Sequence, residues 1–152
     1  TSPAEIDAIV ARARAAQRDW RRVPVADRVR AVAQMVPAFR AMADQVALDI
    51  TRQMGKPIQQ AQNEIGTMID RAETMCRLAE GALADEPLPP KAGFDRFIRH
   101  EPLGVVAAVT PWSFPVGIAG IPIVCGLAVG CTTVWRRSEQ APRCANTYGC
   151  RV

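Results

Sequence analysis

Two stretches, EPLGVVAAVTPWSFP at residues 101–115 and LAVGCTTVWRRSEQAP at 127–142, carry the strongest structural signal in this 152-residue chain. From 105 to 135 there is no charged residue, and short apolar runs alternate with glycine and proline. Apolar runs bounded by turn residues are typical of buried strands in a parallel sheet, joined by a crossover helix. We therefore predict a βαβ unit over 105–142. Its expected elements are strands at 105–110 and 132–136 and a helix at about 115–129.

The same uncharged run raises an alternative, because about 20 apolar residues suffice to cross a bilayer. Prolines and glycines divide the run into short pieces, which disfavours one continuous transmembrane helix. A membrane-associated protein through 105–135 is therefore the weaker interpretation, kept as an alternative. The interrupting residues are Pro111, Pro115, Pro122, Gly117, Gly120, Gly126 and Gly130.

Upstream, residues 1–84 carry the apolar periodicity of amphipathic helices. Ser2 and Glu5 have the spacing of a capping box, which predicts a helix start. Pro37 removes a backbone donor within the second periodic segment and predicts a kink or a break there. The expected helices span about 3–18, about 25 to the Gly55-Lys56-Pro57 stop, and about 58–82.

The remaining segments divide the chain into four regions. Residues 85–104 are proline-rich and predict an extended connector, in which 94–99 is an exposed strand suited to self-association. After 142 the periodicity ends, so 143–152 is predicted to be an irregular tail. The expected fold class is α/β, with an amino-terminal helical layer plus an incomplete Rossmann-like parallel βαβ unit.

Composition excludes several function classes. With 49% hydrophobic and 22% charged residues, the chain is typical of a soluble globular protein rather than a disordered one. The net charge of +4 comes from scattered arginines without interleaved aromatic residues, which disfavours nucleic-acid binding. His100 is the sole histidine and no cysteine pair has CxxC spacing, so no metal site is predicted. Five cysteines and no secretory signal predict reduced thiols and a cytoplasmic location.

The two quoted stretches closely resemble the nucleotide-binding start of the NAD(P)-dependent aldehyde dehydrogenases. That family usually reads EPLGVV-x-x-x-TPWNFP and then ALAAGCTVV-x-KPSEQTP. DWRRVPVADR at 19–28 and MGKPIQQAQNEI at 54–65 are also similar to the family's helical region, in the same order. The resemblance extends to about Pro142 and implies oxidation of an aldehyde to a carboxylic acid with NAD or NADP.

The resemblance also implies a nicotinamide nucleotide site beyond the carboxyl ends of the two strands, where open parallel sheets bind ligands. A carboxylate at Glu139 suits the ribose hydroxyls of NAD, whereas the 2′-phosphate of NADP would meet its charge unless Arg136 and Arg137 offset it. We therefore favour NAD over NADP. The implied cofactor-binding residues are Thr110, Pro111, Trp112, Arg136, Ser138 and Glu139.

Position 113 departs from the family pattern, which has an asparagine there that helps to hold the oxyanion; this chain has Ser113. The family's nucleophilic cysteine and general-base glutamate lie beyond the matched residues, and Cys125 and Cys131 are interpreted as small core residues. These departures predict a truncated relative that is inactive alone, binds nucleotide weakly and self-associates. The alternative is a non-catalytic oligomerisation or interaction module.

Overall fold

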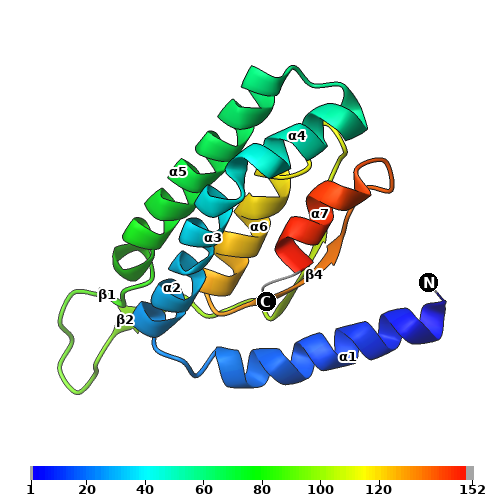
Figure 1. The fold of residues 1–152 in the computed structure, drawn as a ribbon. Helices are drawn as coiled ribbons and strands as arrows, with labels where there is room; N and C mark the ends of the chain where they lie inside the picture. The colour runs from blue at the N-terminus through cyan, green and yellow to red at the C-terminus, as the bar shows by residue number, and fades with distance from the viewer. Residues whose placement is uncertain (1, 150–152) are drawn as a thin grey trace.

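The computed structural model describes residues 2–149 of the chain. Figure 1 shows a layer of packed helices, a long first helix that lies apart from it, and a short parallel strand pair between them. The elements in order are α1 Pro3–Trp20, α2 Val25–Ala33, α3 Met35–Ala41, α4 Ala43–Met54, α5 Ile58–Ala82, β1 Glu86–Pro87, β2 Phe97–Ile98, β3 Val105–Val109, α6 Gly117–Ala128, β4 Thr132–Arg136 and α7 Pro142–Gly149.

Helix α1 begins as its sequence predicts. The backbone N–H of Glu5 donates to Ser2 Oγ at 3.3 Å, and the N–H of Ser2 donates to Glu5 Oε2 at 2.6 Å, which completes the capping box. The helix packs mainly against β3 and β4. Of its apolar stripe, Ile9, Val10 and Ala13 are half-buried and Ile6 is exposed. The buried residue within Pro3–Trp20 is the polar Gln17.

Pro37 breaks the second periodic segment, as expected. Helix α2 ends at Ala33, whose carbonyl lies one turn before the proline ring and would clash with it in a continuous helix. A further break at Met42, which has φ −106° and ψ 5°, separates α3 from α4 and was not expected from the sequence. Helix α4 stops at Gly55, whose φ of 75° is the left-handed conformation that glycine adopts without strain.

The hydrophobic core lies between α5 and the helices around it. Helix α5 has the predicted bounds and packs against α2, α3, α4 and α6. Burial of these apolar faces supplies most of the stability of short helices. The least exposed core residues include Ile50, Ile65, Val116, Ala119 and Val124.

The predicted βαβ unit is confirmed. Strands β3 and β4 pair in parallel from Val105↔Thr132 to Val109↔Arg136, and α6 forms the crossover. The predicted strand at 105–110 is one residue shorter, and the helix spans 12 residues. Among residues 2–149, no helix is both long enough and apolar enough to span a membrane.

The connector forms a hairpin. Strand β1 pairs antiparallel with β2 through Glu86↔Ile98 and Pro87↔Phe97, so the regular strand predicted at 94–99 is limited to two residues. Phe94 makes an isolated bridge with Lys91 at the turn instead of extending β2. Phe94, Phe97 and Ile98 are exposed, as expected.

The prediction of an irregular tail is wrong for most of the segment, because α7 occupies Pro142–Gly149. Ala141, Cys144 and Tyr148 are buried, at the i, i+3, i+7 spacing of one helix face. The Tyr148 hydroxyl donates to the Val116 carbonyl at 2.7 Å, which anchors α7 to α6. This buried stripe has only three members, which is too few for the sequence pattern to indicate a helix. Residues 150–152 of the predicted tail lie outside the described residues.

Candidate functional site

The carboxyl ends of β3 and β4 lie side by side, as the predicted site requires. The N–H of Thr110 donates to the carbonyl of Arg136 at 3.2 Å, and Trp135 Nε1 donates to Thr110 Oγ1 at 2.8 Å. Thr110 is 7% exposed. Its hydroxyl and N–H therefore hold the strand ends together.

The other expected nucleotide-site residues follow these two strand ends. Pro111 and Trp112 are exposed, and Ser113 is half-buried. Glu139 accepts from Arg136 Nη2 at 2.5 Å, with the two side chains 80% and 64% exposed. Ser138 completes this edge, and its Oγ accepts from the N–H of Gln140 at 3.2 Å.

A buried ion pair beneath the β3–α6 loop was missed by sequence reasoning. Lys56 Nζ contacts Glu64 Oε2, and these side chains are 8% and 1% exposed. Lys56 also donates to the carbonyl of Ser113 at 2.9 Å. Glu64 Oε1 accepts from the N–H groups of Val116 at 3.0 Å and Gly117 at 2.9 Å.

This pair, the Lys56–Glu64 clamp, fixes both the loop and the helix that follows it. The first N–H groups of a helix lack intrahelical partners and carry partial positive charge, which a carboxylate stabilises. Glu64 supplies that carboxylate to α6 from a different helix, while Lys56 holds the loop at Ser113. The sequence signal was a charged residue, Glu64, on the buried i, i+3, i+4 stripe of α5 with Ala61 and Ile65.

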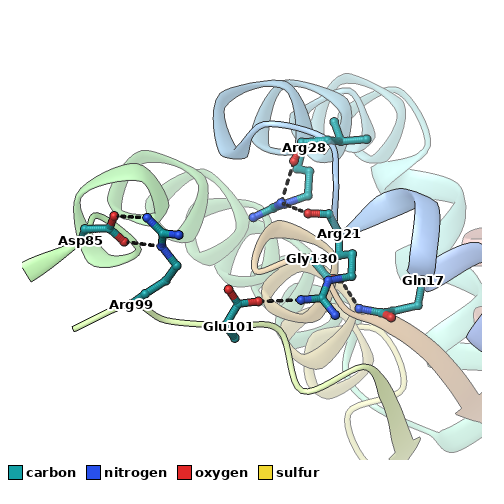
Figure 2. Close-up of polar contacts among 8 residues, drawn as sticks. Gln17, Arg21, Arg28, Asp85, Arg99, Glu101 and Gly130 are labelled. Carbon is teal, nitrogen blue, oxygen red and sulfur yellow. Dashed lines mark hydrogen bonds and ion pairs between the residues drawn. The ribbon is translucent and has the colours of Figure 1, made fainter. Parts of the chain in front are cut away.

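The opposite end of α6 is held by polar side chains from α1 and α2. Figure 2 shows Gln17 Nε2 donating to the carbonyl of Gly130, at 3.3 Å, and Arg28 beside the same turn. Arg28 Nε donates to the carbonyl of Ala128 at 3.0 Å, and Trp20 Nε1 donates to that of Leu127 at 2.8 Å. A cation at a helix carboxyl end is favourable, although burial lowers the pKa of Arg28.

The thiols of Cys125 and Cys144 lack the environment of a catalytic nucleophile. Burial raises the pKa of the Cys125 thiol, whereas reactive cysteines have lowered values. Burial, with smaller contributions from Asp49 and Glu64, raises the pKa of Cys144 to about 11. Cys131 is buried, as expected for a core residue, and Cys125 is half-buried. No cluster of metal-binding side chains occurs within residues 2–149.

Comparison with known proteins decides the family, because the sequence model for the aldehyde dehydrogenase family matches residues 1–149. The chain belongs to the aldehyde dehydrogenase family. A curated aldehyde dehydrogenase relative, the N-succinylglutamate 5-semialdehyde dehydrogenase of Novosphingobium aromaticivorans, is 30% identical over 138 residues. That match covers 91% of this chain and 29% of the relative, so the chain spans under a third of that relative's length.

Solved aldehyde dehydrogenases have the same fold over nearly all of this chain. The aldehyde dehydrogenase of Brucella melitensis biovar abortus has a TM-score of 0.91 at 27% identity, covering 98% of this chain and 31% of that protein. The succinic semialdehyde dehydrogenase of Streptococcus pyogenes, solved with NADP⁺ as the cofactor, has a TM-score of 0.87 at 25% identity, with coverage of 97% and 32%. The expected family and α/β fold class are thereby confirmed.

Proposed function

We propose that this chain forms the amino-terminal part of the nucleotide-binding half of an aldehyde dehydrogenase that oxidises an aldehyde to a carboxylic acid with NAD or NADP. The observation that carries the proposal is the pair of adjacent strand ends after β3 and β4, with the loop between β3 and α6 held by the Lys56–Glu64 clamp. A rigid loop at the carboxyl edge of a parallel sheet is the usual place for nucleotide binding.

The side chains at this edge fit the ribose end of a nicotinamide nucleotide. Glu139 is exposed and its carboxylate has acceptor positions beyond those used by Arg136, so it can accept from ribose hydroxyls. Arg136 partly offsets the charge that a 2′-phosphate would meet. We favour NAD, with NADP retained because the Streptococcus pyogenes relative was solved with NADP⁺. When bound, the nucleotide accepts a hydride from the substrate.

Ser113 stands at the family's oxyanion position. Its backbone carbonyl is held by Lys56, and the ring of the next residue, Phe114, lies 3.7 Å from Lys56 Nζ. The position is therefore preorganised, which is what stabilisation of a developing oxyanion needs. Serine has a shorter donor than asparagine, and losing one well-placed oxyanion donor typically costs about 2.7–4 kcal/mol of barrier.

For the 152-residue chain alone we expect weak nucleotide binding and no aldehyde oxidation, because only one βαβ unit contributes. Calorimetry should give dissociation constants for NAD⁺ and NADP⁺ weaker than micromolar, a free energy less favourable than about −8 kcal/mol. Glu139→Gln should shift the preference towards NADP⁺ by removing a like charge, whereas Glu80→Gln, an exposed change on α5, should not.

Two outcomes would contradict the expectation that the chain alone binds nucleotide weakly and is inactive. Micromolar or tighter binding by the chain alone would show that the strand ends suffice without further contacts. NADH formation that disappears in Ser113→Ala would show that the chain carries its own chemistry.

A second candidate function is a non-catalytic interaction module, favoured by the exposed apolar residues around β3. Val109 is 79% exposed at the end of β3, and within residues 2–149 that strand pairs only with β4. Open strand edges promote association with another chain. Phe94 and Phe97 are further exposed apolar residues, on the hairpin.

We accordingly expect the chain to self-associate at micromolar concentrations through the β3 edge. Val109→Lys should shift the sedimentation profile towards monomer, because an edge lysine opposes strand pairing. Ile6→Lys is the matched control, since Ile6 is also apolar and is 49% exposed, but lies on α1. Equal sedimentation of the unmodified chain and both variants as monomers would refute the module.

A further inference from the structure

One side of α1 carries charges of both signs that have no partner in the described part of the chain. The helix packs on β3 and β4 along the stripe that includes Ile6 and Val10 (Figure 1). Its opposite side is exposed and carries Asp7, Arg12 and Arg14. None of these three makes a hydrogen bond or ion pair with any of residues 2–149. We refer to this side as the outer face of α1, formed by Ala4, Glu5, Asp7, Ala8, Ala11, Arg12, Arg14 and Ala15.

The spacing of these charges prevents them from pairing within one helix. Opposite charges pair along a helix when they are three or four residues apart. Glu5 and Arg12 are seven residues apart, as are Asp7 and Arg14, which corresponds to about 10 Å along the axis. Between Glu5 and Arg12, over Ala8, lies a surface hollow of about 410 Å³. Partners for these charges must therefore come from another molecule.

A second copy of α1 in the antiparallel direction supplies all of these partners at once. With a two-fold axis beside the middle of the stretch 4–15, Glu5 meets the partner's Arg12 and Asp7 meets the partner's Arg14. Each contact then occurs twice. Glu5 has a carboxylate oxygen available for it, because the capping box uses only Oε2. The outer face is thus complementary in charge to itself, as a two-fold interface requires.

The residues between the charged positions allow two such helices to approach closely. Ala4, Ala8, Ala11 and Ala15 follow one another at intervals of four, three and four residues, and all four are exposed. These intervals are those of the contact positions in paired helices. In the antiparallel register Ala8 lies against the partner's Ala11, and Ala4 lies against the partner's Ala15. The separation of packed helices depends on the side chains at the contact, and alanine keeps it short.

The same face disfavours a parallel pair. Arg18 is exposed and continues the alanine row, three residues after Ala15. In a parallel pair equivalent positions face each other, so Arg18 would meet the partner's Arg18. Like charges in contact oppose association. The antiparallel register avoids this contact, because it places Arg18 beyond the stretch 4–15.

We propose that the outer face of α1 binds a second copy of this chain, with the two α1 helices antiparallel. The proposal depends neither on nucleotide binding nor on association through the β3 edge. Two helical stretches of this length bury less than the about 1,200 Å² of a standard stable interface. We therefore expect weak dimerisation, with a dissociation constant of about 0.1–1 mM.

The test is sedimentation equilibrium of the 152-residue chain carrying Val109→Lys, which suppresses association through the β3 edge. In this background Asp7→Lys and Arg14→Glu should each weaken dimerisation about fivefold, because each replaces two attractive contacts by repulsive ones. An equimolar mixture of the two variants should regain the association of the parent chain, since positions 7 and 14 again face each other with opposite charges. A variant that had merely lost the α1 helix could not be rescued by mixing.

The matched control is a mixture of Glu80→Lys with Arg77→Glu in the same background. Both positions are exposed on α5, and the two changes in net charge are the same as in the α1 pair. Neither of these variants, nor their mixture, should alter the dissociation constant of the parent chain. Circular dichroism of all four variants checks that the helices are retained.

Three results would overturn the proposal. The first is a Val109→Lys chain that stays monomeric at concentrations around the expected dissociation constant. The second is a mixture of the Asp7 and Arg14 variants that associates no better than either variant alone. The third is an equal change of association in the α5 variants, which would indicate a general effect of net charge.

Discussion

Replacing Glu64 with leucine is expected to lower the free energy of unfolding by about 3–5 kcal/mol, the usual cost of removing one partner of a buried ion pair. Lys56 would keep its buried ammonium without a carboxylate. The N–H groups of Val116 and Gly117 would also lose their acceptor at the start of α6. Urea unfolding followed by circular dichroism measures the loss, which is a large part of the stability of a small domain.

Two comparisons isolate the buried position as the cause. Glu73, on the same helix as Glu64, forms an exposed ion pair with Arg40 of α3. Glu73→Gln breaks that pair and should lower the free energy of unfolding by about 1 kcal/mol or less. The double variant Lys56→Met with Glu64→Leu should recover part of the loss, because it removes the unpaired charge. A Glu64→Leu variant that unfolds at the same urea concentration as Glu73→Gln would show that the clamp contributes little to stability.

The second large effect is expected at Arg28. Arg28→Met should lower the free energy of unfolding by about 2–3 kcal/mol, since each buried carbonyl left without a donor costs about 1–3 kcal/mol. The guanidinium donates to the carbonyls of Ala128 at 3.0 Å and Val23 at 2.7 Å. Methionine keeps an apolar stem of similar length, so lost packing should contribute little.

Arg30→Met provides the matched comparison on α2. Arg30 is exposed and forms an ion pair with Asp27. The same denaturation measurement should therefore show that the free energy of unfolding falls by about 1 kcal/mol or less. Similar losses at Arg28 and Arg30 would mean that the contacts at the carboxyl end of α6 do not stabilise the fold. A loss confined to Arg28 would identify them as the attachment of α6 to the first two helices.

The candidate site could be predicted only in part. The motif and the order of strand and helix were enough to place Thr110, Trp112 and Glu139 at strand ends, because those positions depend on local pattern. They did not reveal that the Thr110 hydroxyl is engaged by Trp135. Nor did they reveal the clamp, because Lys56 and its contact at Ser113 are 57 residues apart.

Features that depend on near neighbours could be predicted from the amino-acid sequence. The capping box at Ser2, the break before Pro37 and the stop at Gly55 each follow from a few adjacent residues, and all three are present. The polar side chains that hold the two ends of α6 are instead set by the packing of distant segments. Glu64 and Arg28 meet backbone groups 52 and 100 residues away. Periodicity indicates that such a side chain faces the core, but its partner is set by how distant helices pack.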